Sequence, residues 1–418
     1  MSQVPETIPR LRGAFDRDGA IALLRRAVAC ESVTGNEREI AALLADELRA
    51  LGASDVEVHD FLPGRGNAWG VRRGTGGGNG VLLIGHTDTV HARGWRERWA
   101  GTERAAPFGG AIVDGALWGR GAADLKGGLC AAIEAVRTLD RAGIALAGDV
   151  GFGFVGDEES GEPGSGVSAG MKDFARLIGD GRFPKPDFAI YLEPTTLDVY
   201  SAQMGFFICD LKITGRSAYF GVPEEGIDAL KATHAVLSAL WAHSRALATQ
   251  GSHALVGASF LLVNAITGGG YIAVPGECRL SLIRKLRPGE ELDAARSVLE
   301  EAVRDTVLDP GINIEFAYPA GRDHRVGGTP SAVDPGHPAI IALAEAMRAL
   351  RPDRGRIAGA PYWSEAPFLV ALGIPTVYCA PGDIRVCHTL EERIEIDEYC
   401  DGTVALAAFL ADYCNRLR

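Results

Sequence analysis

Five apolar runs in this chain each end in residues that can bind a metal ion or transfer a proton. The runs are GVLLIGHTD, ALWGRGAADLKGG, VGFGFVGDEESG, FAIYLEPTT and IPTVYCAPGDIRVCHTLEE. Short apolar runs of this kind are typical of buried strands. The polar residues at their ends are His86, Asp88, Asp124, Glu158, Glu159, Glu193 and His388. Two histidines and five carboxylates at the ends of buried strands predict a hydrolytic site for two metal ions.

Length and charge restrict the classes of protein to which the chain can belong. With 418 residues, the chain is expected to form about two domains and to bury large cores. The formal net charge is -12, from 42 Lys and Arg against 54 Asp and Glu, and no block of basic residues stands out. Nucleic acids and anionic membranes are therefore not expected as partners.

No targeting signal and no disulfide framework is visible in the sequence. The first residues, MSQVPETIPRLRGAF, contain no apolar core of signal-peptide length, and no apolar run is long enough to span a bilayer, so we expect a cytoplasmic protein. The eight cysteines form no CxxC pair, which argues against a zinc finger. Cys387 precedes His388, but adjacent side chains point in different directions, and we expect buried free thiols.

Residues from about 14 to 204 alternate between helical and strand patterns. Residues 40–51 and 125–139 have helical periodicity, and VLLIG, GDVGFGFV and FAIYLEP are expected strands. Such alternation predicts an α/β domain with a mainly parallel sheet and helices on both faces. Because ligands bind beyond the carboxyl ends of such strands, the candidate residues lie where a site is expected.

The pattern changes after residue 204. Over 205–325 the expected order is strand, helix, two strands, helix and strand, with the helices at 225–247 and 290–307. This is the order of a ferredoxin-like α+β unit. Helix 338–350, strand GIPTVYCAPG and helix 396–416 then resume the first pattern. We therefore expect a catalytic domain at 1–204 and 326–418, interrupted by an inserted domain at 205–325.

The residue types suggest how the metal site is organised. His86 and Asp88 are two apart at a strand end, so their side chains share a face, and the carboxylate can accept the imidazole N–H while the other ring nitrogen binds metal. Asp124 follows the glycine-rich segment GRGAA and can bridge two ions. Glu158 and Glu159 are consecutive and must diverge, which suits one proton shuttle and one ligand.

Each motif has an alternative explanation when it is taken alone. An HxD sequence at a strand end is more often an ordinary polar pair, the DEE sequence is usually a solvated loop, and Glu193 before proline can simply open a turn. Their joint occurrence in order argues against chance. With Glu193 and His388, each ion would have about three protein ligands and an open position for water.

These motifs resemble those of the M20 metallopeptidase family, which includes acetylornithine and succinyl-diaminopimelate deacylases, aminoacylases and glutamate carboxypeptidases. The matching landmarks, in order, are GHTDTV, GRGAADLKGG, GDEESG, LEPT and CAPGD followed by CHTLEE. The resemblance covers nearly the whole chain. It implies a zinc-peptidase-like catalytic domain and an inserted lid domain through which such proteins commonly dimerise.

The resemblance also implies roles for individual residues. One or two divalent transition-metal ions per subunit would be bound by His86, Asp124, Glu159, Glu193 and His388. Asp124 would bridge the two ions, and Asp88 would orient His86. Glu158 would be the general base that acts on metal-activated water. The carboxylate-rich set with two imidazoles suits zinc, manganese or cobalt.

The chain departs from the family pattern in the lid. The segment GRSAYFGVPEEGIDAL has Tyr219 where the family has a histidine that reaches a partner's active site, and YIAVP has Ile272 where the family has asparagine. Arg284 keeps a position often used to bind a substrate carboxylate, and WSEA at 363–366 replaces the family's GTDA. The expected pocket has therefore lost an imidazole and an amide and gained apolar surface.

Three functions remain open from the sequence. The first is hydrolysis of an amide bond in a small carboxylate-bearing substrate, such as an N-acyl amino acid or a dipeptide. The second is removal of an amino group from an aromatic acid, because the resemblance includes a relative that acts on nitroanthranilate. The third is a catalytically silent metal-binding scaffold, which would not need Glu158.

Overall fold

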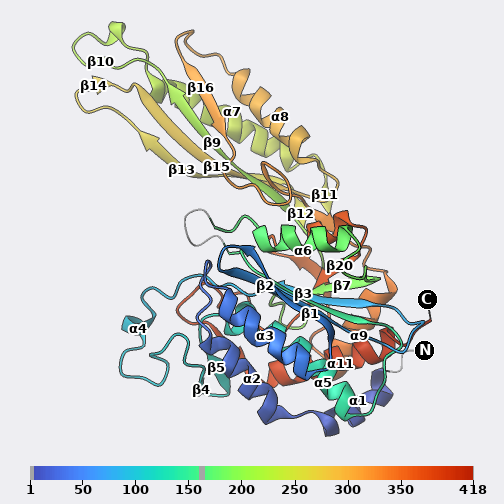
Figure 1. Ribbon diagram of the computed structural model, residues 1–418. Coiled ribbons are helices and arrows are strands. Elements are labelled where there is room, and N and C mark those ends of the chain that lie inside the picture. Colours follow the sequence, from blue (N-terminus) through green and yellow to red (C-terminus); the bar gives the residue numbers. More distant parts are fainter. Residues whose placement is uncertain (1–3, 160–164, 418) are drawn as a thin grey trace. The chain divides into compact units, whose positions relative to one another are not determined.

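The computed structural model describes residues 4–159 and 165–417. The chain divides into two compact units (Figure 1). The large unit comprises Met1–Ser201, Val333–Ala358 and Ser364–Arg418, and the inserted unit comprises Ala202–Ala332 and Gly359–Trp363. In the described part of the chain, no helix has both the length and the apolar character needed to cross a membrane.

The large unit is built around a mixed sheet. Its main path runs in the order β1 (Ser54–Leu62), β2 (Arg65–Arg72), β6 (Val150–Val155), β3 (Val81–His86), β7 (Phe188–Tyr191), β20 (Thr376–Tyr378) and β8 (Val199–Gln203). The pairs β6–β3, β3–β7 and β7–β20 are parallel, as the sequence predicted for the centre of the sheet. The pairs β1–β2, β2–β6 and β20–β8 are antiparallel. The sheet is therefore parallel at its centre and antiparallel towards its edges.

The remaining elements of the large unit are helices and short strands. The helices are α1 (Val4–Ala14), α2 (Arg17–Ala29), α3 (Arg38–Ala50), α4 (Trp95–Arg98), α5 (Gly127–Arg141), α6 (Ala169–Gly179), α9 (Pro338–Leu350), α10 (Ala366–Ala371) and α11 (Ile396–Tyr413). The short strands are β4 (Ala111–Val113), β5 (Ala116–Trp118), β19 (Ile357–Ala360) and β21 (Arg393–Glu395). An irregular helical turn, η1 (Ala122–Lys126), precedes α5.

Helices cover both faces of the central strands. Every residue of β3 and β6 is buried, as continuous apolar runs require. A Cβ added at Gly85 would lie 2.7 Å from Leu125 beside α5, and one added at Gly153 would lie 2.7 Å from the ring of Phe174 in α6 and 3.3 Å from Ile84. Because Ile84 and Gly85 are consecutive in β3 and point to opposite faces, α5 and α6 lie on opposite sides of the sheet.

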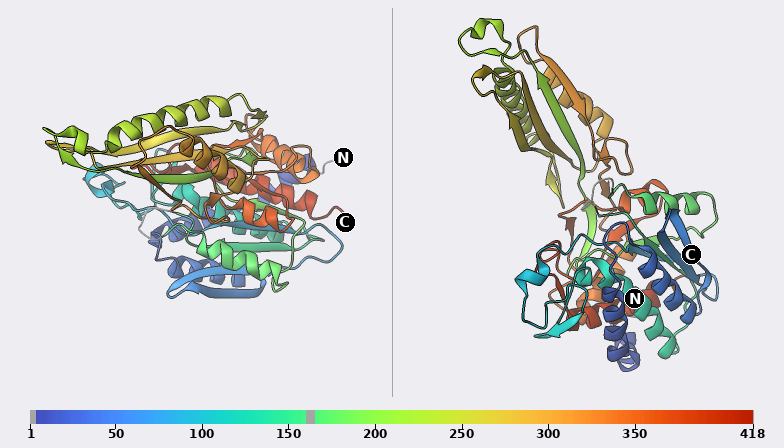
Figure 2. Two further views of the ribbon diagram at one scale, coloured as in Figure 1. Left: turned by 90° about the horizontal axis from the view of Figure 1, so that it is seen from above. Right: turned by 60° about the vertical axis from the view of Figure 1, so that its left-hand side comes forward.

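The inserted unit has an antiparallel sheet in the order β13 (Phe260–Gly268), β15 (Glu277–Leu286), β9 (Gly205–Thr214) and β16 (Asn313–Ala317). Helices α7 (Ala229–Leu247) and α8 (Leu292–Arg304) pack on one face of this sheet (Figures 1 and 2). The chain order is strand, helix, two strands, helix and strand. The smaller elements are β10 (Ala218–Tyr219), η2 (Pro223–Glu225), β11 (Ser252–His253), β12 (Gly257–Ala258), β14 (Ala273–Val274), β17 (Gly327–Gly328) and β18 (Ser331–Ala332).

Local sequence explains this layered arrangement. The carboxylate of Asp228 accepts hydrogen bonds from the N–H groups of Leu230 and Lys231, so α7 begins with a capped first turn. Burial alternates strictly along β15, so one face of the strand packs under the helices and the other remains open. All eight cysteines are free and buried, as expected.

Candidate metal centre

The predicted ligands come from separate segments that end at one edge of the large unit's sheet. His86 is the last residue of β3, Glu159 follows β6, and Glu193 follows β7. Because β3 lies between β6 and β7 in parallel register, the carboxyl ends of these strands are neighbours. Asp124 lies in η1, and His388 lies in the loop between β20 and β21. The fold therefore brings together residues that are distant in sequence.

The ligands form two groups around one carboxylate. Nε2 of His86 lies 3.1 Å from Oδ1 of Asp124 and 3.7 Å from Oε1 of Glu193. Nε2 of His388 lies 3.2 Å from Oδ2 of Asp124 and 2.9 Å from Oε1 of Glu159. We call the first group the His86 triad and the second the His388 triad. Each triad has one imidazole and two carboxylates, and Asp124 belongs to both.

The donor set fits a divalent transition metal. One ligand atom each from His86, Asp124 and Glu159 lie within 4.8 Å of one another, and all three residues are buried. Imidazole nitrogen and carboxylate oxygen are ligands for zinc, manganese and cobalt. These residues therefore form a possible metal site.

The pKa values of the cluster show how strongly its charges interact. Burial raises the pKa of Glu193 to about 8, opposed by His86 and increased further by the repulsion of Asp124. Hydrogen bonds to Asp124 and Glu159 raise the pKa of His388 to about 11. Burial by itself raises the pKa of Asp124, but its bonds to His388 and His86 outweigh that effect and lower the pKa well below the usual range. The carboxylates in this site therefore need positive charge close to them.

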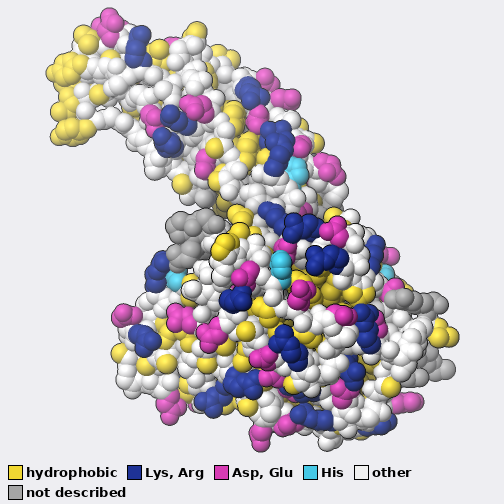
Figure 3. Space-filling view, in the orientation of Figure 1, with side chains coloured by type: hydrophobic (Ala, Val, Ile, Leu, Met, Phe, Trp, Pro, Cys, Tyr) yellow, Lys and Arg dark blue, Asp and Glu magenta, His cyan; other side chains and the backbone are white. Residues whose placement is uncertain are grey.

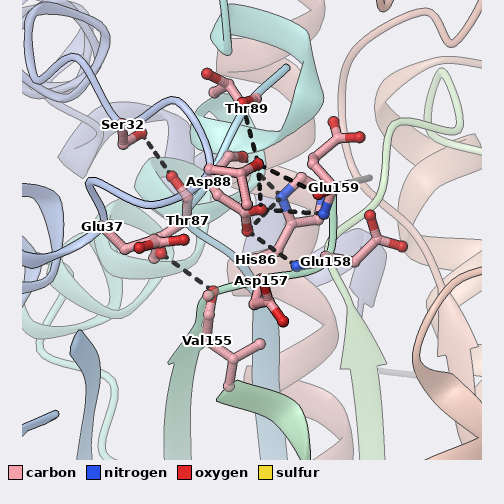
Figure 4. Close-up of polar contacts among 12 residues, drawn as sticks. Ser32, Glu37, His86, Thr87, Asp88, Thr89, Val155, Asp157, Glu158 and Glu159 are labelled. Carbon is pink, nitrogen blue, oxygen red and sulfur yellow. Dashed lines mark hydrogen bonds and ion pairs between the residues drawn. The ribbon is translucent and has the colours of Figure 1, made fainter. Parts of the chain in front are cut away.

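Glu158 has a different environment from Glu159. Figure 4 shows the two side chains pointing apart from a shared turn. In the described part of the chain, Glu158 contacts neither imidazole, and its side chain is only partly buried. Desolvation raises its pKa well above the ordinary value, with His86 opposing and Glu159 adding repulsion. The two adjacent glutamates therefore differ, because Glu159 contacts His388 and Glu158 contacts neither imidazole among the described residues.

Comparison with known proteins identifies the family. Residues 82–412 match the model of peptidase family M20/M25/M40. The chain belongs to this family. It is a hydrolase that acts on carbon–nitrogen amide bonds. The resemblance seen in the motifs is thereby confirmed.

Curated relatives and solved structures of the M20 family match almost the whole chain. The chain is 26% identical over 407 residues to N-formyl-4-amino-5-aminomethyl-2-methylpyrimidine deformylase of Bacillus subtilis, covering 91% of this chain and 90% of the relative. It is 29% identical over 389 residues to acetylornithine deacetylase of Vibrio cholerae, covering 91% and 92%. An M20 family metallo-carboxypeptidase from Sulfolobus solfataricus has the same fold, with a TM-score of 0.74, 16% identity and coverage of 94% and 99%.

One predicted contact of the M20 site is replaced by another. Nδ1 of His86 lies 2.9 Å from the main-chain oxygen of Asp88 but 3.9 Å from the nearer carboxylate oxygen. The main-chain carbonyl is therefore the hydrogen-bond partner of the ring. The expectation that the Asp88 carboxylate orients His86 is wrong in this respect, because that carboxylate is directed towards the turn at Glu158 and Glu159.

Several supporting residues were not predicted from the sequence. Oε1 of Glu392 accepts the N–H groups of Ala123 and Asp124 at 3.3 and 3.2 Å, and Glu392 also pairs with Arg120. Ser364 donates a hydrogen bond of 2.7 Å to Oε1 of Glu193. The second glutamate of CHTLEE and the serine of WSEA were visible in the sequence, but their partners follow only from the fold.

The predicted substrate-binding residues all lie in the inserted unit. Tyr219 and Ile272 are 62% and 53% exposed; Tyr219 is the last residue of β10, and Ile272 directly precedes β14, the strand that pairs with β10. Arg284 is only 2% exposed and forms an ion pair of 3.0 Å with Glu290. Its strand partners Leu261 and Phe207 are also buried, on the face under the helices. This placement argues against Arg284 as the anchor of a substrate carboxylate.

Proposed function

We propose that this M20 protein hydrolyses the amide bond of a small carboxylate-bearing substrate, such as an N-acyl amino acid or a dipeptide. The observation that carries the proposal is the position of Asp124 between two imidazoles, with Glu158 beside them. The relatives named as an acetylornithine deacetylase and a deformylase support a substrate with a small acyl group.

The two triads would hold one or two divalent ions, for which zinc, manganese and cobalt are all suitable. When bound, such ions lower the pKa of water and polarise a scissile carbonyl. Asp124 would be shared, and Glu193 and Glu159 would complete the separate triads.

Glu158 would supply the proton transfers. Its carboxylate would accept a proton from the attacking water and then donate it to the leaving nitrogen. Burial raises the pKa of Glu158 above its ordinary value, which makes its carboxylate a stronger proton acceptor. Glu159, fixed against His388 at 2.9 Å, is less suited to this task.

We further propose that Lys285, and not Arg284, binds the carboxylate of the substrate. Lys285 is the next residue along β15, so it lies on the open face of the inserted unit's sheet, where its strand partners are Phe206 and Phe260. Its Nζ lies 5.6 Å from the ring centroid of Phe206, and the guanidinium of Arg322 lies 5.9 Å from the same centroid. Within the described residues, neither cation has a carboxylate partner. Two such cations beside one ring favour an anionic ligand.

The surroundings of these cations also favour a flat or apolar substrate body. The rings of Phe206 and Trp363 are 5.5 Å apart and meet edge to face. Aromatic surface of this kind gains about 25 cal/mol per Å² of apolar area removed from water. The same observation supports the second candidate, an aminohydrolase of aromatic acids.

Product analysis by mass spectrometry separates these functions. The metal-loaded protein would be incubated with N-formyl, N-acetyl and N-succinyl amino acids, dipeptides and aminobenzoates. Release of an acyl acid or an amino acid is the expected result. Release of ammonia from aminobenzoates alone would favour the aminohydrolase. If no product forms from any class of substrate, the metal-binding scaffold is the remaining function.

We also propose that the protein is a homodimer, or a larger homo-oligomer, assembled through the inserted unit. The edge strand β13 exposes Phe260, Leu262 and Ile266, and α7 exposes Trp241. Figure 3 shows further hydrophobic side chains gathered at the end of the inserted unit that carries β10 and β14. Exposed apolar residues along an unpaired strand edge are typical of protein interfaces.

A further inference from the structure

The carboxylate of Asp88 is fully buried and accepts three hydrogen bonds. Oδ1 accepts the N–H of Glu158 at 3.2 Å, and Oδ2 accepts the N–H of Glu159 at 3.0 Å (Figure 4). Oδ2 also accepts the hydroxyl of Thr34 at 2.9 Å. Both oxygens therefore accept hydrogen bonds from the turn at residues 158–159, and Oδ2 also accepts one from Thr34.

The turn needs these acceptors because it has left the sheet. The last bond at the end of β6 runs from the N–H of Thr87 to the oxygen of Val155 at 2.7 Å. Asp157 then has a φ of 73°, which turns the chain away from the strand direction. The following N–H groups have no strand partner, and an unpaired buried N–H costs about 1–3 kcal/mol. The Asp88 carboxylate satisfies both of them.

The hydrogen-bond partner of the His86 ring is the main chain of residue 88, because the carboxylate lies farther away, at 3.9 Å. Nδ1 of the ring lies 2.9 Å from the main-chain oxygen of Asp88, and a main-chain oxygen is present whatever side chain occupies position 88. The bond fixes the ring so that Nε2 faces Asp124. The backbone of Asp88 therefore contacts the His86 triad, and its side chain contacts the turn that carries Glu159 of the His388 triad.

We propose that Asp88 is a positioning residue whose carboxylate fixes the Glu158–Glu159 turn, while its backbone carbonyl accepts the hydrogen bond of the His86 ring. The inference rests on the two-ion site proposed above. Removing the carboxylate should displace the base Glu158 and the ligand Glu159 together. The His86 triad should remain in place.

Asp88→Asn tests this proposal with almost no change in volume. The NH2 group of the carboxamide can only donate hydrogen bonds. It would therefore face a main-chain N–H of the turn without being able to accept its hydrogen bond. We expect the ion in the His388 triad to bind about 10- to 100-fold more weakly, which is typical when a partner of a ligand is removed. The ion in the His86 triad should change little. Competition titrations of Zn²⁺ and Co²⁺ against a chelating dye, starting from metal-free protein, would resolve the two steps.

Ligand variants assign each titration step to a triad. Glu159→Gln should weaken one step and Glu193→Gln the other. In double-mutant cycles, Asp88→Asn should be less than additive with Glu159→Gln and additive with Glu193→Gln. Ser364→Ala is a matched control, because it removes a bond to Glu193 and should affect only the His86 triad.

A milder variant protects the test against loss of folding. Thr34→Val removes one donor to Oδ2 and should weaken the same step as Asp88→Asn, by a smaller factor. For any folded variant, kcat should fall while KM for the substrate stays near the wild-type value, because Glu158 is displaced.

Two outcomes would overturn the inference. One is that Asp88→Asn weakens the step assigned by Glu193→Gln, which would mean that the carboxylate supports His86. The other is that neither Asp88→Asn nor Thr34→Val changes the step assigned by Glu159→Gln. If the wild-type protein binds no metal at all, the proposed function itself fails, so the two failures are distinguishable.

Discussion

Nε2 of His388 lies 3.2 Å from Oδ2 of Asp124, although the two residues come from distant parts of the chain. The other oxygen of the same carboxylate faces His86 at 3.1 Å. Asp124 is thus the one residue of the cluster that contacts both imidazoles among the described residues. The account given above depends on this shared position.

Asp124→Asn should therefore abolish binding at both triads, because a carboxamide offers only one oxygen and no charge. Glu193→Gln should leave one ion, since the His388 triad keeps all its ligands. Metal content measured by mass spectrometry after gel filtration checks both results. Retention of full metal content by Asp124→Asn would show that the carboxylate is not shared.

Glu158→Gln should lower kcat by about 10²–10⁴-fold, the usual contribution of a positioned proton-transfer group. Metal content should stay at the wild-type level, because Glu158 belongs to neither triad. Steady-state kinetics combined with metal analysis makes the comparison, with Glu159→Gln as the control that does lose metal. Near-normal turnover, or loss of metal from Glu158→Gln, would assign the two roles differently.

Substrate binding should depend on pH through Lys285. Burial lowers the pKa of Lys285 to about 8, so its charge is complete below about pH 7 and is lost as the pH rises through 8. KM for a carboxylate substrate should be constant on the acidic side and rise about tenfold per pH unit above the pKa. Lys285→Ala should raise KM at neutral pH, and Lys285→Arg should move the rise in KM to higher pH.

Arg284→Ala is the matched control for Lys285, because it lies one residue away but pairs with Glu290 under the helices. It should lower the melting temperature by leaving Glu290 without its cation, with little effect on KM. A large increase in KM for Arg284→Ala, with no change for Lys285→Ala, would restore the assignment made from the sequence alone.

Light scattering should show at least a dimer. Leu262→Glu and Ile266→Glu place charges on the exposed side of β13 and should yield smaller species with unchanged metal content. A wild-type protein that is a stable and fully active monomer would contradict the proposed assembly.

Local sequence patterns predicted the central strands, and three of the predicted ligands, His86, Asp124 and Glu159, lie together as a possible metal site. The runs ending at His86, Glu159 and Glu193 are continuous apolar segments. Such segments indicate buried strands from the local sequence alone. The hairpin of β1 and β2 was not predicted, because β1 alternates between half-buried and exposed residues and has no clear apolar run.

The positioning contacts could not be predicted, because they depend on tertiary distances. Choosing between Arg284 and Lys285 requires knowing which residues of β15 face the helices, because a shift of one residue exchanges the two faces of a strand. Likewise, the spacing of His86 and Asp88 places both on one face but does not decide whether backbone or carboxylate meets the ring.

The most direct test of the central claim is the metal dependence of amide hydrolysis. A verified metal-free preparation would be assayed on the substrate cleaved best in the panel, before and after addition of zinc, manganese or cobalt. The account predicts no turnover without metal, recovery on addition, and no recovery for Asp124→Asn. Full activity in the metal-free protein would contradict it.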